Sequence, residues 1–246
     1  ALTWPIASLG WVTSLIQRAA ASQTRINEFL QTKPIIKDKD EKLNSDYTVS
    51  DIEFKNVTFR YDDTGIIALK NVSFKIKQGQ SLAIVGKTAS GKSTIAHLLC
   101  RLYDVTDGEI LINSGNIKTI PLHRYRSQIG YVPQDVFLFS DTISNNIAFS
   151  IDEDKIEAKD VEKAAKNAAV HSNIEAFPAK YQTVVGERGI TLSGGQKQRI
   201  SIARALIKKP QVLIFDDCLS AVDTETEEEI LTNLKNEMVN KTTVII

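Results

Sequence analysis

The sequence predicts an α/β fold with a mostly parallel core sheet, an antiparallel β edge section and an α-helical subdomain. Three observations predict it. An apolar strand at 81–85 leads into a glycine-containing loop and then a helix, and a second apolar strand at 212–215 ends in two aspartates. Before both, apolar residues alternate from residue 51 onward, which is typical of half-buried strands.

The composition suits a globular core and excludes one class of partner. Of the 246 residues, 42% are hydrophobic and 24% are charged. Thirty basic residues balance thirty acidic ones, so bulk charge gives no reason to expect binding to nucleic acid. Cys100 and Cys218 have no paired spacing, which favours reduced thiols in a reducing compartment.

Residues 1–30 differ from the rest. Their first half carries no charge before Arg18, includes Trp4 and Trp11, and is too short to cross a bilayer alone. We expect the cytoplasmic end of a last transmembrane helix whose earlier part precedes this sequence; the alternative is an amphipathic helix packed on a soluble domain. Residues 31–50 are charged and interrupted by Pro34, which predicts a linker before a domain at 51–246.

The first strands of that domain are predicted from alternation. Apolar side chains at Ile52 and Phe54, then at Val57 and Phe59, change phase between the two pairs, which indicates a β-bulge. Residues 67–76 continue in the same manner. Gly79 closes this section in a turn.

The loop after the strand at 81–85 matches a phosphate-binding pattern, Gly-x4-Gly-Lys-Ser, between a strand and a helix. Glycines let backbone N–H groups face phosphates, the helix N-terminus and Lys92 add positive charge, and Ser93 offers a hydroxyl to Mg²⁺. Ile95, Leu98, Leu99 and Leu102 would form the apolar helix face. The expected nucleotide contacts are Gly86, Lys87, Thr88, Ala89, Ser90, Gly91, Lys92, Ser93 and Thr94.

Asp216 ends the second apolar strand, where a carboxylate can hold Mg²⁺ beside such a loop. By itself this residue would be read as a turn aspartate. The Asn240-Lys241 pair lacks the aspartate of a guanine-reading motif, so ATP is the expected nucleotide.

The later elements are mostly helical. Apolar residues between 161 and 174 predict a helix, and Ser193 is placed as the N-cap of another that carries Ile200, Ala203 and Leu206, so a helical subdomain is expected at about 136–208. An acid-rich turn at 224–229 begins a further helix, and a strand starts at Thr243.

Leu-Ser-Gly-Gly-Gln at 192–196 follows the phosphate loop by about a hundred residues. In this order the two motifs resemble the ATP-binding cassette (ABC) family of transport ATPases, P-loop NTPases whose exporter half-transporters fuse a membrane domain to the cassette. The resemblance covers 51–246. It implies a dimer in which this helix end contacts ATP held by the partner chain, through Leu192, Ser193, Gly194, Gly195 and Gln196, with Asp223 at the dimer seam.

The resemblance assigns further roles. Tyr61 would stack on adenine, and Gln134 of the segment 131–134 would reach Mg²⁺, the attacking water and the membrane domain. Residues 185–189 resemble an exporter element that faces the membrane domain. Together these imply Ser93, Gln134 and Asp216 as metal ligands, and Lys92, Gln134 and Asp217 as catalytic residues. The purely structural alternatives are a solvated side chain for Gln134, a core aromatic for Tyr61 and an exposed turn for residues 185–189.

Three departures from the family matter. Asp217 stands where a glutamate usually polarises the attacking water, and the missing methylene withdraws the carboxylate by roughly 1.3 Å, which predicts slow hydrolysis at this chain's own site. Ala89 replaces a common glycine, a mild change provided that its φ is negative. The family's switch histidine would lie beyond residue 246, since His97, His123 and His171 do not occupy its place.

We therefore expect an ATP- and Mg²⁺-dependent exporter cassette on the cytoplasmic side of the cell (inner) membrane. Its partners would be its own membrane domain and a second half-transporter subunit. A heterodimer is favoured, and the alternative is a homodimer that hydrolyses ATP with Asp217 as the base. A small molecule or lipid would be transported. One alternative is a chiefly regulatory ATP-binding subunit. A DNA-repair cassette is disfavoured because no sustained heptads separate Lys92 from Leu192.

Overall fold

A computed structural model describes residues 3–37, 47–152, 156–186, 192–218 and 224–246. The chain divides into two compact units, 1–37 and 38–246. The first contains α1 (Thr3–Gln31), a largely exposed helix that ends shortly before Pro34. No helix among the described residues is both long enough and apolar enough to span a bilayer.

The second unit begins with an antiparallel sheet in the order β2-β1-β4-β5. Its strands are β1 (Ile52–Arg60), β2 (Ile67–Ile76), β4 (Asp107–Ile112) and β5 (Gly115–Asn116). The predicted bulge is confirmed, because the β1–β2 register shifts between Phe54 and Val57, where Asn56 has a φ of 48°. The bulge lets the apolar residues on both sides of it face the core.

A parallel sheet in the order β3-β8-β7-β6 confirms the predicted α/β class. It consists of β3 (Ser81–Ala83), β6 (Ile129–Val132), β7 (Val212–Phe215) and β8 (Thr242–Ile245). All four β7 residues are buried. Val212 and Ile214 pack into one apolar cluster and Leu213 and Phe215 into another, so this strand separates two cores.

The predicted buried strand at 81–85 is wrong in length and in burial. β3 stops at Ala83, although the Ile84 amide still donates to the Ile245 carbonyl at 2.8 Å, and Val85 is 94% exposed. Among the described strands β3 pairs only with β8, so its other edge is unpaired, and its side chains are less buried than those of β7.

Helix α2 (Lys92–Leu99) follows the loop, and its residues Ile95, Leu98 and Leu99 pack between residues of both sheets. The expected fourth member of its apolar face, Leu102, is 46% exposed. Arg101, which directly precedes Leu102, has a φ of 50° in the left-handed region. The chain therefore leaves the helical path before Leu102, whose side chain does not join the apolar face of α2.

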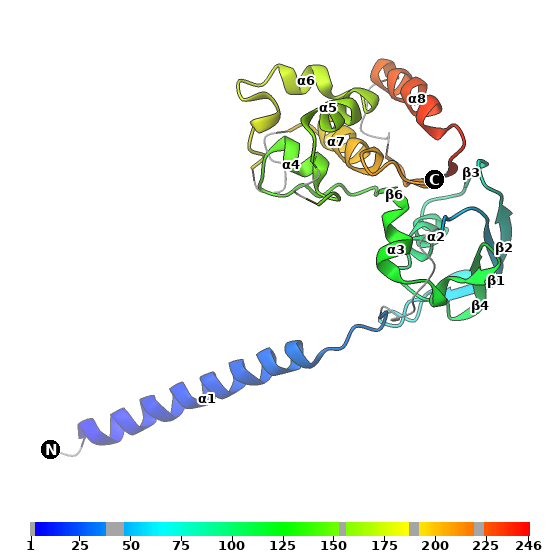
Figure 1. Cartoon of the computed structure of the whole chain (residues 1–246). Coiled ribbons are helices and arrows are strands. Elements are labelled where there is room, and N and C mark those ends of the chain that lie inside the picture. Colours follow the sequence, from blue (N-terminus) through cyan, green and yellow to red (C-terminus); the bar gives the residue numbers. More distant parts are fainter. Residues whose placement is uncertain (1–2, 38–46, 153–155, 187–191, 219–223) are drawn as a thin grey trace. The chain divides into compact units, whose positions relative to one another are not determined.

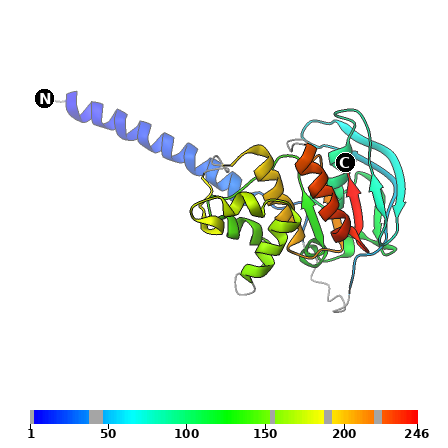
Figure 2. The same ribbon diagram turned by 90° about the horizontal axis from the view of Figure 1, so that it is seen from above.

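The predicted helical region is present between residues 136 and 208 and lies away from β1, β2 and β4 (Figures 1 and 2). The expected helix at 161–174 is two helices, because Ala169 adopts a φ of 52° between them. The helical region as a whole contains α4 (Ile143–Ala148), α5 (Ala158–Asn167), α6 (His171–Glu175), the 3₁₀ turn η3 (Lys180–Gln182) and α7 (Gly194–Leu206).

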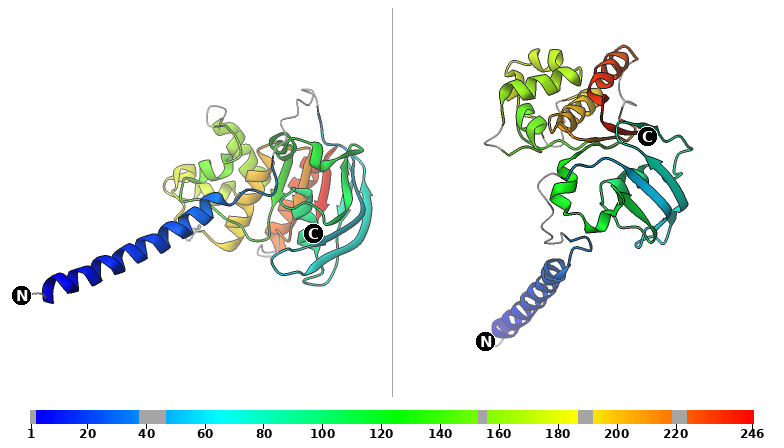
Figure 3. Two further views of the ribbon diagram at one scale, coloured as in Figure 1. Left: turned by 90° about the horizontal axis from the view of Figure 1, so that it is seen from below. Right: turned by 45° about the vertical axis from the view of Figure 1, so that its right-hand side comes forward.

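The remaining short elements are η1 (Ile117–Thr119) and α3 (Leu122–Ser127), which precede β6. The acid-rich turn begins α8 (Thr224–Met238), as predicted. Figure 3 gives two further views of these elements. Cys100 and Cys218 are both buried and unpaired, as their spacing predicted.

Candidate functional site

The loop between β3 and α2 borders a cavity of about 360 Å³. Gly91 is the N-cap of α2 with a φ of 90°, and a Cβ on it would lie 2.4 Å from the Ala68 carbonyl oxygen. Only glycine fits this close approach between the loop and β2. The cavity is lined by Tyr61, by residues 66–68 of the β2 start, and by loop and helix residues 89–94.

The Lys92 ammonium lies inside the loop's own curve. Its Nζ donates to the carbonyl oxygens of Gly86 and Lys87, each at 3.1 Å. The N-terminus of α2 lies at the same place, so a full charge and a helix dipole are concentrated at one end of the cavity. Of the predicted phosphate-binding residues, 89–94 line the cavity, and Gly86 and Lys87 contact the Lys92 ammonium through their carbonyl oxygens.

Ala89 does not meet the condition under which its methyl group was expected to be harmless. Its φ is 62°, in the left-handed region. A side chain with a Cβ costs about 1 kcal/mol or more there, because the Cβ approaches the following carbonyl oxygen. The departure from glycine at this position is therefore a strained one rather than a mild one.

Two of the three predicted metal ligands are in contact. The Ser93 hydroxyl donates to Oδ1 of Asp216 at 3.0 Å, and Asp216 is only 2% exposed. The Tyr131 hydroxyl donates to Oδ2 of the same carboxylate at 3.5 Å, and burial together with Asp216 raises the pKa of Tyr131. A buried carboxylate beside a hydroxyl is a donor set that fits Mg²⁺, a hard cation that prefers oxygen ligands.

The third predicted ligand contacts the predicted base. Nε2 of Gln134 donates to Oδ2 of Asp217 at 3.0 Å, joining the segment after β6 to the segment after β7. Asp217 has a φ of 46°. The two side chains expected to position the attacking water therefore contact each other, and Asp217 directly follows Asp216 in the sequence.

Tyr61 follows the end of β1 and lines the cavity, as its role requires. Its hydroxyl and the Thr94 hydroxyl are 3.0 Å apart, and its ring packs edge-on against Phe59 and Tyr103 at centroid distances of 4.8 and 5.5 Å. These contacts fix the ring at the cavity wall.

The Leu-Ser-Gly-Gly-Gln segment begins α7 in the way that its sequence predicted. Ser193 is the N-cap, its Oγ accepting from the Gln196 amide at 3.2 Å, while Oε1 of Gln196 accepts from the Ser193 amide at 3.0 Å. Leu192 is buried. Within the described residues no hydrogen bond or ion pair links this segment to the phosphate loop of the same chain.

Some predicted residues lie outside those that the structure describes. Asp223 falls within 219–223, and three residues of the element 185–189 fall within 187–191; of that element, Val185 is fully buried. Sequence reasoning included Tyr131 only as part of the segment 131–134 and missed its contact with Asp216. It also missed the cavity wall at 66–68, which belongs to a different sheet from β3.

Comparison with known proteins finds similarity to one family. The family description "ABC transporter" matches residues 69–220. The chain is 41% identical over 244 residues to the multidrug resistance-like ATP-binding protein MdlA of Escherichia coli (strain K12), covering 99% of this chain and 41% of that protein. It is 40% identical over 242 residues to an ATP-dependent lipid A-core flippase of Syntrophus aciditrophicus (strain SB), covering 98% and 40%.

A solved structure is also similar, that of a bacterial Atm1-family ABC exporter with ATP bound. It superposes with a TM-score of 0.85 at 39% identity and covers 100% of this chain and 43% of that one. The chain thus spans about two fifths of the length of the proteins that it matches.

Proposed function

The chain belongs to the ABC transporter family, and we propose that it is the ATP-hydrolysing cassette of an exporter-type half-transporter. ATP-binding domains of this family are ATPases, which favours turnover over the purely regulatory alternative. The observation that carries the proposal is that Lys92, Ser93 and the α2 N-terminus line one cavity, while Ser93 donates to the buried Asp216 carboxylate.

In the proposed complex each group has a separate task. Lys92 and the amides of the loop hold the phosphates, Ser93 and Asp216 hold Mg²⁺, and Tyr61 stacks on adenine. Mg²⁺ supplies charge stabilisation for phosphoryl transfer. Gln134 and Asp217, which contact each other, would orient the attacking water.

The capped start of α7 is proposed to act on a second chain. Residues 192–196 present the first amides of a long helix, which form an anion site, and they have no polar contact with the phosphate loop of their own chain within the described residues. A cassette dimer places such a helix end over the partner's γ-phosphate. Asp223 would lie at the same seam.

We further propose that the membrane domain of the longer protein docks on an aromatic surface formed by Phe137, Phe139 and Phe149. All three are exposed. Phe139 stacks on Phe149 at 4.3 Å and meets Phe137 edge-on at 5.0 Å, while the Arg204 guanidinium lies within 6 Å of two of the rings. Exposed aromatic clusters of this kind mark interfaces. The cassette would then lie at the cytoplasmic face of the cell membrane, and the transported compound would be a small molecule or lipid.

Asp217 is proposed to slow this chain's own site, so that a second, different subunit carries most of the turnover. Its carboxylate is one methylene shorter than that of glutamate, and a misplacement of about 1 Å can cost roughly a hundredfold in rate. The bond to Gln134 supports the positioning role, because it places the Asp217 carboxylate beside the expected metal ligand.

The test is ATP hydrolysis by the full-length protein, purified alone and with its partner subunit. We expect Asp217→Glu to raise kcat of the protein alone by about ten- to a hundredfold, and Asp217→Asn to lower it further. Lys92→Ala, which removes phosphate binding, serves as the inactive control. Fast turnover by the unaltered protein alone, with no gain from Asp217→Glu, would contradict the slow-site proposal and favour the homodimer alternative.

A further inference from the structure

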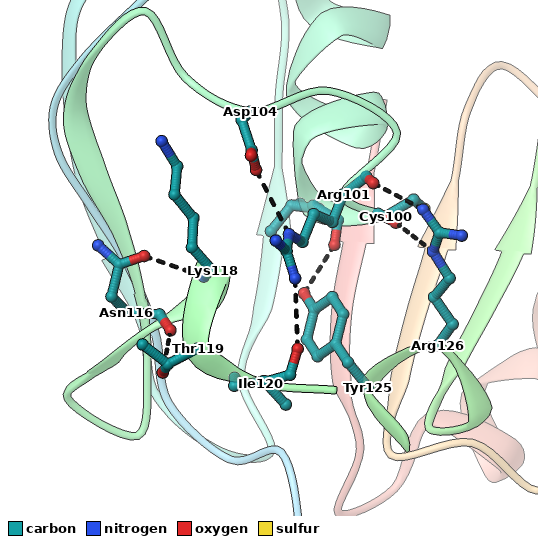
Figure 4. Close-up of polar contacts among 10 residues, drawn as sticks. Cys100, Arg101, Asp104, Asn116, Lys118, Thr119, Ile120, Tyr125 and Arg126 are labelled. Atoms are coloured by element: carbon teal, nitrogen blue, oxygen red, sulfur yellow. Dashed lines mark hydrogen bonds and ion pairs between the residues drawn. The ribbon is translucent and has the colours of Figure 1, made fainter. Parts of the chain in front are cut away.

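The carbonyl oxygens at the C-terminal end of α2 accept hydrogen bonds from two side chains of α3 (Figure 4). The Tyr125 hydroxyl donates to the Leu99 carbonyl at 2.6 Å. Nε of Arg126 donates to the Cys100 carbonyl at 3.1 Å, and its Nη2 donates to that of Arg101 at 2.7 Å. Leu99 is the last residue of α2 and Cys100 is its C-cap. These bonds therefore satisfy carbonyls that a helix end leaves without partners inside the helix.

Arg126 also brings a charge to this end of the helix. The C-terminus is the negative end of a helix dipole, so a guanidinium bonded there is stabilising. Helix α2 has eight residues, which separates its two ends by about 12 Å. Arg126 thus holds the end of α2 that lies opposite the phosphate-binding end.

Helix α3 leads directly into β6. It ends at Ser127, and β6 begins at Ile129. Nζ of Lys208 braces this connection, since it donates to the carbonyls of Arg126 at 2.8 Å and Ile129 at 2.9 Å. Among the described strands β6 pairs only with β7, so it is an edge strand of the parallel sheet. The bonds of Arg126 therefore join α2 to an element that has strand partners on one side only.

Both elements also reach the predicted nucleotide site. The first turn of α2 carries Ser93, which donates to Asp216, and Gln134 lies two residues after β6 and donates to Asp217. Asp216 and Asp217 are consecutive in the sequence. The two elements are thus connected at the site through these aspartates, and at their other ends through Arg126.

We propose that Arg126 is a positioning residue for ATP hydrolysis: it fixes α2 relative to β6, and so places Gln134 with respect to the nucleotide held at the start of α2. The inference rests on the proposed function, because it assumes MgATP in the cavity beside Lys92. Most of the groups that would bind the nucleotide lie on α2, its loop and the end of β1, whereas Gln134 follows β6. Loss of the Arg126 bonds therefore slows the chemical step more than it weakens nucleotide binding.

The test is single-turnover hydrolysis of ATP by the full-length protein alone, together with the Kd of MgATP from equilibrium binding. Arg126→Met removes both bonds and keeps the apolar stem. We expect hydrolysis to become about tenfold slower while Kd changes less than about twofold. Arg126→Lys should restore most of the rate, because an ammonium has three donors for the two carbonyls. If Arg126→Met does not fold, Arg126→Gln takes its place.

Lys118→Met is the matched control. Lys118 lies in η1, near this cluster in Figure 4, and within the part of the chain that the structure describes no hydrogen bond or ion pair joins its ammonium to α2. Its loss should change neither rate nor Kd. An unchanged rate in Arg126→Met, an equal loss of rate and of binding, or no recovery in Arg126→Lys would overturn the proposal.

Hydrogen exchange gives a readout that does not need turnover. We expect MgATP to slow amide exchange across residues 129–135 in the unaltered protein and in Lys118→Met, but not in Arg126→Met. If the unaltered protein binds MgATP without hydrolysing it, the proposed hydrolysis fails, and this measurement alone decides the role of Arg126. Equal protection in the unaltered protein and Arg126→Met, or no protection in either, would then overturn that role.

Discussion

At the scale of single residues, the nucleotide loop stores strain at Ala89. Its φ of 62° keeps the loop curved around the Lys92 ammonium, although alanine disfavours that conformation. The cost is borne by the ligand-free fold, so it is measurable without nucleotide.

We predict that Ala89→Gly raises the free energy of unfolding by about 0.5–1 kcal/mol, because relief of left-handed strain exceeds the extra entropy of glycine in the unfolded chain. Urea denaturation measures it. Ala164→Gly, inside α5, is the matched control and should lower the same quantity by about 1 kcal/mol or more. If both substitutions destabilise equally, Ala89 is not strained.

The residues of the site were largely predictable and their contacts were not. Lys92, Ser93 and Asp216 follow from local patterns of glycine, hydroxyl and strand-ending carboxylate. The contact of Tyr131 with Asp216 spans 85 positions and arises only because β6 and β7 are neighbours in the sheet. The φ of Ala89 likewise depends on how the loop closes on Lys92.

At the scale of elements, the β1 bulge and β4 are fitted to each other through Gly108. This glycine has a φ of 78°, and a Cβ on it would lie 2.4 Å from the Asn56 carbonyl oxygen and 2.5 Å from that of Lys55. The bulge therefore needs both its own irregular register and a bare backbone on the neighbouring strand.

We predict that Gly108→Ala lowers the free energy of unfolding by more than about 3 kcal/mol, since backbone atoms on both strands must move apart. Gly65→Ala is the control. Gly65 has a φ of 70° but no atom within 4 Å of the new Cβ, so only the backbone cost of about 1 kcal/mol applies. An equal decrease in the free energy of unfolding for the two variants would show that the close contact between Gly108 and the bulge does not contribute to the destabilisation.

The spacing of apolar residues predicted this bulge. The alternation changes phase between Phe54 and Val57, and only an irregular register lets the apolar residues on both sides of that point face the core. It failed at Val85, where no described strand covers the outer edge of β3, and at Leu102, where Arg101 turns the chain after α2. Such endings depend on neighbours and on a single left-handed residue, which a repeating pattern does not encode.

At the scale of the whole molecule, each of the two cores encloses one thiol. Cys100 belongs to the core around α2 and Cys218 to the core of the helical region. Burial raises the pKa of both to about 12 from about 9. Both thiols are therefore neutral in the folded state well into alkaline solution.

We predict that stability falls as the pH rises from about 9 to about 12. The folded state retains both thiol protons in this range while the unfolded state loses them, so unfolding releases protons and is favoured by alkali. Denaturation of the double variant Cys100→Ala, Cys218→Ala should show a shallower fall. Identical slopes for the variant and the parent would contradict the burial of these groups.

The α/β class and the family could be recognised from order and spacing, since the phosphate loop, residues 192–196 and the strand before Asp216 each carry a local signature. The division into two cores could not. Every residue from Val212 to Phe215 is apolar, so the sequence alone does not reveal that alternate side chains serve different clusters.

If the loop holds phosphates as proposed, nucleotide entry is an exchange reaction, because the Lys92 ammonium already donates to two carbonyl oxygens of its own loop. An incoming phosphate would replace these neutral acceptors with charged ones, and the gain in charge would drive the exchange. Adenosine would offer no charged acceptor and would leave the ammonium where it is. The loop would then select for polyphosphate before the base is recognised.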